Sequence, residues 1–262
     1  MKPWYWLMIG ISITSVTSAD QFQIPFFQDA EKLFWEQVYP DGGWTLYCGE
    51  RFENPQNVVI DDIYAKEWAM QYFQCESLDQ CRTQNAKFSR IESDLHNMYP
   101  ALPTVAKARA DYPFGPIAGE FRDFFECNFE YDARDQLAEP RSVAQGNIAR
   151  AILYMHLEYD LPLDKEMLVR MLDWNRADPP SKDEIRRNAV IEKLQGTRNP
   201  FIDHPTQAEK LLARKKGDPP ANRGSVLTNP DLMPNLFAEF KWLEFDPFHD
   251  PAESRTTPPA LR

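Results

Sequence analysis

Four cysteines constrain the fold of this chain more than any other sequence feature: Cys48, Cys75, Cys81 and Cys127. An even number of cysteines in an exported chain favours disulfides. Cys75 and Cys81 are close enough to close a small loop, which leaves Cys48 with Cys127, although four cysteines allow three connectivities. A zinc site is the alternative, but the paired Cys-x-x-Cys spacing is missing and oxidation outside the cytosol removes thiolates. Disulfides are therefore expected.

The N-terminus indicates export. After Lys2, an apolar run extends from Trp4 to about Val16, and the small residues of 17–19 follow. This pattern predicts a secretory signal peptide over residues 1–19, cleaved after Ala19. The alternative is a membrane anchor, but the run is shorter than the roughly 20 residues that span a bilayer. No later segment is long and apolar enough to span, so we expect no membrane association after cleavage.

Composition is typical of a globular protein. The 262 residues suffice for one large domain or two small ones, and the 43% hydrophobic content can supply a core. A collagen-like, low-complexity or wholly disordered chain is excluded. With 29 Lys and Arg against 40 Asp and Glu, the net charge of −11 argues against a surface that coats polyanions. One local basic patch can still hold a phosphate backbone.

Apolar periodicity predicts a mixture of helices and short strands. Helices are expected over about 26–39, 64–73 and 164–174, and strands over 46–48 and 58–60. Another helix is expected to begin after Gly146 with Asn147 as its cap. A further helix starts near Ser181, in a capping-box pattern, and runs to about Leu194, with Gly196 as its C-terminal cap. Residues 206–262 contain eight prolines and predict a mostly extended, Pro-rich C-terminal extension.

The chemistry-bearing residues form polar clusters rather than a common catalytic motif. No P-loop, GxGxxG, GxSxG or HExxH is present, and the chain has only four histidines. The clusters are Asp61-Asp62, Glu92 with the 94–97 segment DLHN, Arg109, Gly146-Asn147 with Arg150, Arg187-Asn188, and 195–200 (QGTRNP). Taken alone, an acid pair at a strand end is most often a solvated turn, and buried arginines or asparagines serve as ion-pair partners or turn caps.

The order and spacing of these clusters resemble the bacterial endonuclease I family, the periplasmic or secreted DNases of the ββα-metal group. The matching segments are LYCGERF (46–52), IDDIYAKEW (60–68), RIESDLHNMYPAL (90–102), FGPI (114–117), GNIARAILYM (146–155), LDWNRADPP (172–180) and EIRRNAVIEKLQGTRNPFID (184–203). The resemblance covers about residues 25–205. It implies an α+β fold: a single disulfide-stapled domain over 20–205, with a ββα-metal core and several helices.

The same resemblance implies one Mg²⁺ or Mn²⁺ ion in the active site. Asn97 matches an asparagine ligand of the family, and Asp61 falls on the metal-binding Glu. Asp62 falls on the catalytic His and Ala65 on a usual Pro. Asp62 is therefore the expected catalytic group, and His96 is the nearest spare base in the sequence. Asp61 is one methylene shorter than the Glu that it replaces, so it reaches less far toward a metal ion. A free Asp has a pKa of about 3.9, so Asp62 would be a weak base near neutral pH unless its surroundings raise that pKa.

Basic residues that flank the DLHN segment are the expected nucleic-acid ligands. They are Lys87, Arg90, Lys107 and Arg109. A further set is expected to order the site from behind rather than to touch DNA. It comprises Arg150, Arg187, Asn188, Arg198 and Asn199.

Two hypotheses for function follow. The first is a monomeric, secreted or periplasmic metal-dependent endonuclease that hydrolyses phosphodiester bonds of DNA without strong sequence specificity, with RNA as a second candidate substrate. The alternative is a catalytically impaired member of the same family that binds nucleic acid or another partner, because Asp62 stands in place of the catalytic His.

Overall fold

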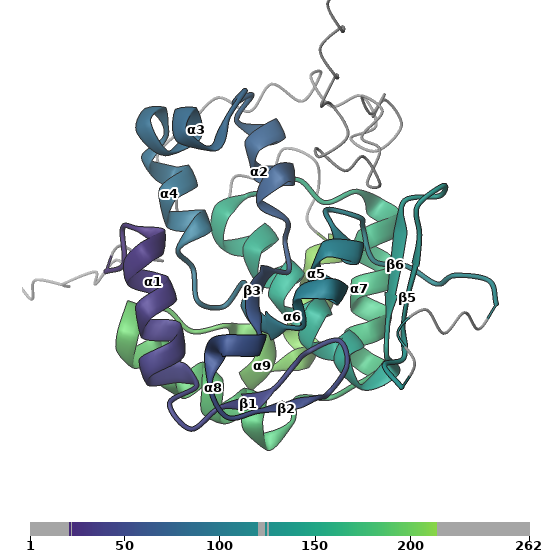
Figure 1. Cartoon of the computed structure of the whole chain (residues 1–262). Helices are drawn as coiled ribbons and strands as arrows, with labels where there is room; N and C mark the ends of the chain where they lie inside the picture. The colour runs from purple at the N-terminus through teal and green to yellow at the C-terminus, as the bar shows by residue number, and fades with distance from the viewer. Residues whose placement is uncertain (1–20, 22, 120–123, 125, 214–262) are drawn as a thin grey trace, which may run out of the picture. The chain divides into compact units, whose positions relative to one another are not determined.

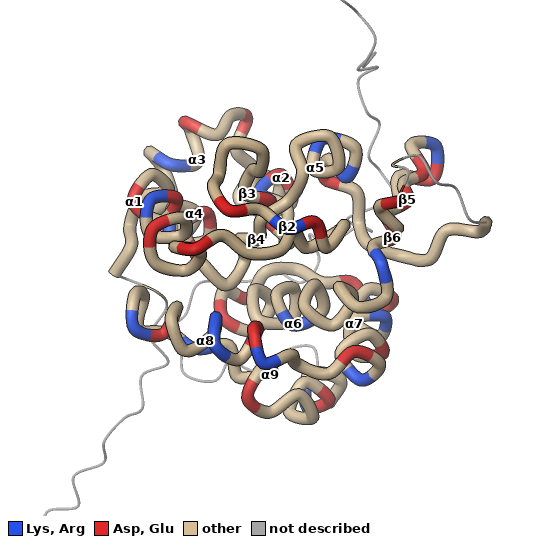
Figure 2. The backbone as a smooth tube through the Cα atoms, turned by 60° about the horizontal axis from the view of Figure 1, so that its bottom comes forward, with Lys and Arg blue, Asp and Glu red and all other residues tan. Residues whose placement is uncertain are grey.

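The computed structural model describes residues 21, 23–119, 124 and 126–213. The predicted signal peptide and most of the predicted C-terminal extension lie outside this part of the chain, so the proposed domain limits remain predictions. Helices and small sheets together confirm the predicted α+β fold. Figure 2 shows that basic and acidic residues are interspersed along the described chain rather than separated onto different elements.

The N-terminal half carries short elements. They are α1 (Phe27–Leu33), a π-helical turn η1 (Phe34–Val38), β1 (Gly43–Trp44), β2 (Arg51–Phe52), a 3₁₀ turn η2 (Pro55–Asn57), β3 (Val59–Asp62), α2 (Lys66–Tyr72), α3 (Leu78–Gln84), α4 (Ala86–Glu92), β4 (Met98–Ala101) and α5 (Pro103–Arg109). The helices predicted over 26–39 and 64–73 are confirmed by α1 with η1 and by α2.

The C-terminal half is dominated by longer helices. Its elements are β5 (Phe129–Asp132), β6 (Leu137–Pro140), α6 (Ser142–Tyr159), α7 (Lys165–Ala177), α8 (Lys182–Gln195), α9 (Pro200–Asp203) and a 3₁₀ helix η3 (Pro205–Ala213). Ser181 caps α8 by accepting a hydrogen bond from the Glu184 amide, and Gly196 ends it at a φ of +79°. Both predicted caps are therefore confirmed.

A ββα unit lies at the centre of the domain. β3 and β4 pair in antiparallel register, with Asp61 opposite Tyr99 and Asp62 opposite Met98. The pairing continues one step further, where the Ile63 amide donates to the Asn97 carbonyl at 3.0 Å. α5 follows β4 directly and contacts β3. This unit therefore brings the predicted acid pair and the DLHN segment to one place.

Helix α6 forms the middle of the larger hydrophobic cluster and pairs with α7. From Ile148 to Met155 every residue is buried, as expected of a helix that other elements cover on all sides. A smaller cluster lies where α1, η1, β4 and α8 meet. Neither α6 nor any other helix in the described residues is both long and apolar enough to traverse a bilayer.

Three expectations about local structure are wrong. Residues 46–48 form a turn rather than a strand, where the Leu46 amide donates to the Pro100 carbonyl and Gly49 follows at a φ of +66°. α6 begins at Ser142, so Asn147 lies inside the helix and caps nothing. The start of the predicted extension is not extended, because residues 206–213 belong to η3 and bury Leu211.

The two disulfides join the pairs suggested by spacing. Cys48 is bonded to Cys127 across 79 residues, and Cys75 to Cys81 across 6. The first bridge ties the turn after β1 to the segment that precedes β5. The second closes the loop between α2 and α3.

Candidate active site

Asp61 is held in place by two buried neighbours. The Tyr47 hydroxyl donates a hydrogen bond to Oδ2 of Asp61, and Nη1 of Arg109 lies 3.7 Å from the same oxygen. Burial raises the pKa of the Asp61 carboxyl, and the Arg109 guanidinium partly offsets this rise. The side chain of Asp61 remains 13% exposed.

Asp62 has an unsatisfied buried oxygen. Its Oδ1 atom is buried and has no hydrogen-bond partner among the described residues. Its Oδ2 atom lies 4.0 Å from Nζ of Lys66, the first residue of α2, whose side chain is 43% exposed. Burial raises the pKa of Asp62 to about 7, which Lys66 opposes and Asp61 reinforces. An unpaired carboxylate oxygen in this position needs a proton or a cation.

Asn97 joins the two halves of the hairpin. Its Oδ1 accepts from the Tyr64 amide at 2.7 Å, and its Nδ2 donates to the Tyr64 carbonyl at 3.0 Å. The side chain therefore extends the β3–β4 ladder beyond the last backbone pair. An amide oxygen has two lone pairs, so Oδ1 can accept a second interaction.

Arg109 is not part of an exposed phosphate patch, which corrects that expectation. It is 1% exposed, and its guanidinium donates to the carbonyls of Asp62 and Ile63 at 2.8 and 2.7 Å. Its planar group also lies over the rings of Trp68 and Phe114. Arg109 lies at the end of α5, and its guanidinium supplies the hydrogen-bond donors for the carbonyl groups at the C-terminal end of β3.

His96 does not lie beside the acid pair, which corrects its assignment as a spare base. The ring is 1% exposed, its Nε2 is 3.1 Å from the Thr197 carbonyl, and it packs edge-on against Tyr154. Burial lowers the pKa of His96 to about 4, with Asp94 opposing the shift. The histidine is thus a neutral packing residue.

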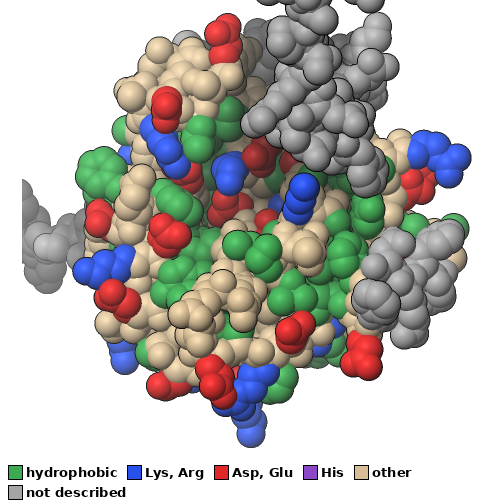
Figure 3. Space-filling model, viewed as in Figure 1, with side chains coloured by type: hydrophobic (Ala, Val, Ile, Leu, Met, Phe, Trp, Pro, Cys, Tyr) green, Lys and Arg blue, Asp and Glu red, His purple; other side chains and the backbone are tan. Residues whose placement is uncertain are grey.

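The other predicted phosphate ligands lie on two separate helices. Lys87 and Arg90 belong to α4 and Lys107 to α5, on opposite sides of α2 in Figure 1. Lys107 is exposed, whereas the other two are half-buried. Figure 3 shows acidic and basic side chains together where the surface between these helices is hollowed. Their role in binding nucleic acid stays a prediction.

Arg187 supports the site from behind. Its Nη2 donates to the carbonyls of Leu95 and Met98. Leu95 lies two positions before Asn97, and Met98 follows it directly. The guanidinium also lies 4.1 Å from the centre of the Tyr99 ring. One side chain of α8 thereby fixes the backbone on both sides of Asn97.

The remaining residues of that set join helices to one another. Arg150 forms a bidentate pair with Glu184 at 2.7 and 2.6 Å, linking α6 to α8. Asn188 and Asn199 hydrogen-bond to each other, and Asn199 also donates to the Arg150 carbonyl. Arg198 pairs with Asp203 and is half-buried. Their contacts place them in the scaffold around the hairpin.

Two residues of the site were missed by the sequence analysis. Tyr47 stands inside the LYCG segment, but nothing in the sequence indicates that its hydroxyl reaches Asp61. Lys66 follows Asp62 by four residues, a spacing that often pairs opposite charges, and this signal could have identified it. Both residues are defined by the way β3 ends and α2 begins.

The oxygen donors of the site fit a hard divalent cation. No group of three His, Cys, Asp or Glu side chains capable of holding a metal occurs in the described residues. Mg²⁺, however, commonly takes one or two carboxylates and retains several waters. The carboxylates of Asp61 and Asp62 and the amide oxygen of Asn97 are of the type that such an ion prefers, and Oδ1 of Asp62 is buried without a partner in the described residues.

Comparisons with known proteins identify relatives of this chain. Residues 30–206 match the family model described as Endonuclease I. A periplasmic deoxyribonuclease and an extracellular deoxyribonuclease of Aeromonas hydrophila are 36% and 35% identical over 124 and 203 residues, 47% and 68% of this chain. An extracellular ribonuclease of Bacillus amyloliquefaciens is 32% identical over 137 residues, 45% of this chain.

The matches cover different shares of these relatives. They span 52% of the periplasmic deoxyribonuclease, 46% of the ribonuclease and 89% of the extracellular deoxyribonuclease. The chain thus spans only about half the length of several curated relatives. The family model nevertheless covers most of the described residues, including the ββα unit and the helices behind it. The chain belongs to the endonuclease I family.

Proposed function

We propose that this protein is an exported, metal-dependent endonuclease that hydrolyses phosphodiester bonds of DNA and acts as a monomer. The observation that carries the proposal is the acid pair at the end of β3, where Asp62 has a buried oxygen without a partner. The names of the relatives support the substrate class and a periplasmic or extracellular location. The ribonuclease among them makes RNA a second candidate substrate.

Asp61 and Asn97 would hold one Mg²⁺ or Mn²⁺ ion, with Asp62 close enough in sequence to contribute. When bound, the ion would stabilise the negative charge that develops on the phosphate and on the leaving oxygen. Tyr47 and Arg109 keep the Asp61 carboxylate in one orientation before the substrate arrives.

Asp62 would accept a proton from the attacking water. In the metal-free protein burial raises the pKa of Asp62 to about 7, near the value that suits a general base at neutral pH, and a bound cation would lower it. A second carboxylate beside a phosphate would repel it, and Lys66 counters this repulsion. Its half-exposed ammonium, 4.0 Å from Oδ2 of Asp62, can contact a phosphate oxygen. Asp62 as proton acceptor and Lys66 as phosphate ligand would thus together replace the catalytic histidine of the family.

A plasmid-nicking assay with Mg²⁺, Mn²⁺ and EDTA tests the proposal. We expect nicking with either metal and none with EDTA. Asp62→Asn should lower kcat/KM by about 100-fold or more, the usual contribution of a general base. Lys66→Met should lower it by a smaller factor. The matched control is Glu53→Gln, an exposed acid outside the site, which should retain full activity.

Asp62→His provides an independent check, because it restores the family's residue and should increase cleavage. If the wild-type protein at high concentration binds DNA and no metal supports cleavage, the catalytically impaired alternative replaces this proposal. If Asp62→His also gives no gain, the assigned register of Asp61 and Asp62 on the family motif is wrong.

A further inference from the structure

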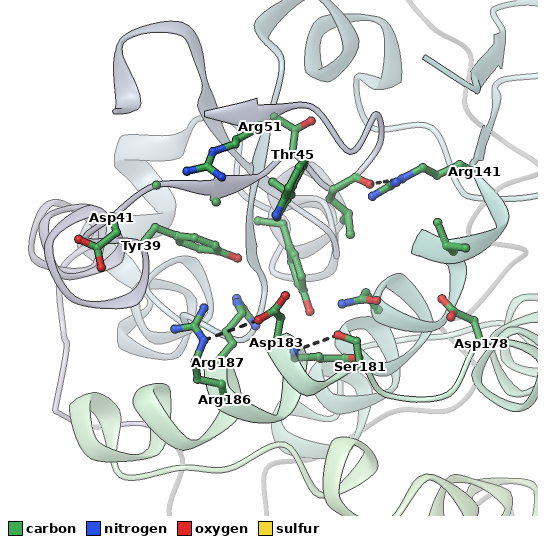
Figure 4. Close-up of a pocket in the computed structure, with 18 of the residues that line it drawn as sticks. Tyr39, Asp41, Thr45, Arg51, Arg141, Asp178, Ser181, Asp183, Arg186 and Arg187 are labelled. Atoms are coloured by element: carbon green, nitrogen blue, oxygen red, sulfur yellow. Dashed lines mark hydrogen bonds and ion pairs between the residues drawn. The ribbon is translucent and has the colours of Figure 1, made fainter. Parts of the chain in front are cut away.

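A second polar cleft lies between the β1–β2 hairpin and the N-terminal ends of α6 and α8. Its volume is about 450 Å³. Figure 4 shows Arg51 approaching it from the hairpin, Arg141 from the start of α6, and Arg186 and Arg187 from α8. None of these arginines contacts the acid pair at the end of β3 in any hydrogen bond or ion pair of the described residues.

Three arginines of the cleft are outside the ion pairs of the structure. Arg51, Arg141 and Arg187 have no carboxylate within ion-pair distance in the described part of the chain. Arg51 is exposed, and Arg141 donates its Nε to the Leu46 carbonyl at 3.0 Å. Arg187 is 4% exposed and donates Nη2 to the Leu95 and Met98 carbonyls. Arg51 and Arg141 are therefore the more accessible of these three cations.

Most of the carboxylates around the cleft already have partners. Glu184 is in the bidentate pair with Arg150, and Asp183 lies 3.9 Å from Arg186. Oδ2 of Asp178 accepts from the Gly146 amide at 3.0 Å. Asp41 remains, exposed at the rim. Three arginines of the cleft therefore face two carboxylates that are in no ion pair of the described residues, Asp41 and Asp178, whereas the whole chain carries a net charge of −11.

An aromatic ring stands at the edge of the same cleft. Trp44 lines it and is 56% exposed, and no ring of the described residues stacks on it. Covering this exposed indole face with a flat apolar group would be favourable. A positively charged groove with an open aromatic face is the combination that binds single-stranded nucleic acid, where bases stack and phosphates pair with cations.

The cleft and the acid pair are joined by one short segment. Trp44, Thr45 and Leu46 line the cleft, and the next residue, Tyr47, donates its hydroxyl hydrogen bond to Asp61. Thr45, Leu46 and Tyr47 are buried, so the connection between the cleft and the proposed catalytic centre runs through the protein interior.

We propose that this cleft binds an unpaired nucleotide of the substrate strand, with its base on Trp44 and its phosphates on Arg51 and Arg141. The inference rests on the proposed function for the identity of the substrate. It adds a preference for unpaired or distorted DNA, because a base in a duplex cannot reach the tryptophan ring without leaving its stack.

Binding is measured without cleavage, on the full mature chain in EDTA, by the fluorescence anisotropy of labelled oligonucleotides. The probes are a thymidine oligonucleotide of about ten nucleotides, an abasic oligonucleotide of equal length, and a duplex. We expect the thymidine strand to bind most tightly. Trp44→Ala should weaken its binding about tenfold and leave the abasic strand unchanged, and Trp44→Phe should restore most of the loss.

Arg51→Gln should weaken both strands, since it removes a phosphate contact. The controls are Phe26→Ala and Arg134→Gln, an exposed aromatic and an exposed arginine outside the cleft, which should bind both strands as the wild type does. Equal melting temperatures establish that the variants fold.

Two results would overturn the inference. One is unchanged binding of the thymidine strand to Trp44→Ala. The other is competition by tripolyphosphate as effective as that by the oligonucleotide, which would make the cleft a site for polyanions in general. Failure of the proposed function is seen separately, as absent nicking by a protein whose oligonucleotide binding still depends on Trp44.

Discussion

The Asp62 carboxyl is partly ionised at neutral pH, and Lys66, at 4.0 Å, is the one cation that pairs with its side chain in the described residues. Its pKa is raised to about 7 in the folded protein, against about 3.9 when unfolded. Between these values the folded state binds a proton that the unfolded state lacks. The metal-free protein therefore loses stability as the pH rises from about 4 to 7.

We predict that Asp62→Asn stabilises the metal-free protein by about 1–3 kcal/mol at pH 8, and that the gain shrinks toward pH 4. Thermal unfolding in EDTA at several pH values measures this difference. Glu53→Gln, an exposed acid, should show no such dependence. A loss of stability in Asp62→Asn at pH 8 would contradict the assignment, because it would mean that the carboxylate has a strong partner.

At the scale of elements, the crossing of α6 with the loop before α8 depends on one glycine. A Cβ atom at Gly146 would lie 2.0 Å from the Asp178 carbonyl oxygen and 2.8 Å from Nη2 of Arg150. A backbone atom cannot move aside as a flexible side chain can. The absence of a side chain at this position lets the loop approach α6 and lets Arg150 reach Glu184.

We predict that Gly146→Ala destabilises the protein by about 1–3 kcal/mol, as other overpacked sites do. The sign of the change in unfolding free energy is informative, because Gly→Ala in the middle of an isolated helix is stabilising by about 1 kcal/mol. Denaturant unfolding measures it, with the exposed Val143→Ala in the same helix as the control. A stabilised Gly146→Ala protein would show that the loop can shift away from α6.

At the scale of the whole molecule, the two disulfides constrain very different lengths of chain. One closes a loop across 79 residues and the other across 6. In the chain-entropy model they stabilise the fold by about 4.5 and about 2.4 kcal/mol. The longer bridge should therefore contribute about 2 kcal/mol more.

We predict that replacing Cys48 and Cys127 by Ala lowers the free energy of unfolding by about 2 kcal/mol more than replacing Cys75 and Cys81. Denaturant unfolding of the two double variants gives the comparison. Each variant lacks two cysteines and one disulfide, so each serves as the control for the other. Equal losses would show that the unfolded chain is already compact between residues 48 and 127.

Much of the fold could be predicted from local sequence, and much of the site could not. Periodicity and caps located α7 and α8, because Ser181 and Gly196 act through neighbouring backbone groups. The turn at 46–48 was predicted as a strand, because its conformation depends on a long-range bond to the Pro100 carbonyl. Local propensity contains no information about such a partner.

The acid pair and Asn97 were found through resemblance, and the structure shows that β3 and β4 bring them together. The burial of Arg109 and His96 could not be predicted, since a charged or titratable residue is usually exposed. Arg109 can be buried because two carbonyl groups accept its hydrogen bonds and two aromatic rings lie against its guanidinium. These groups come from two stretches of the chain, 62–68 and 109–114, and their contact is set by the tertiary fold.

The hydrogen bonds from Arg109 to the carbonyls of Asp62 and Ile63 have a consequence for the proposed catalytic centre. Because the last peptide groups of β3 are clamped from inside, the directions of the two acidic side chains are set in advance. Little of the binding free energy is then spent on reorganisation, and the protein is preorganised for chemistry. Loosening this clamp should slow turnover even where every group that meets the substrate is intact.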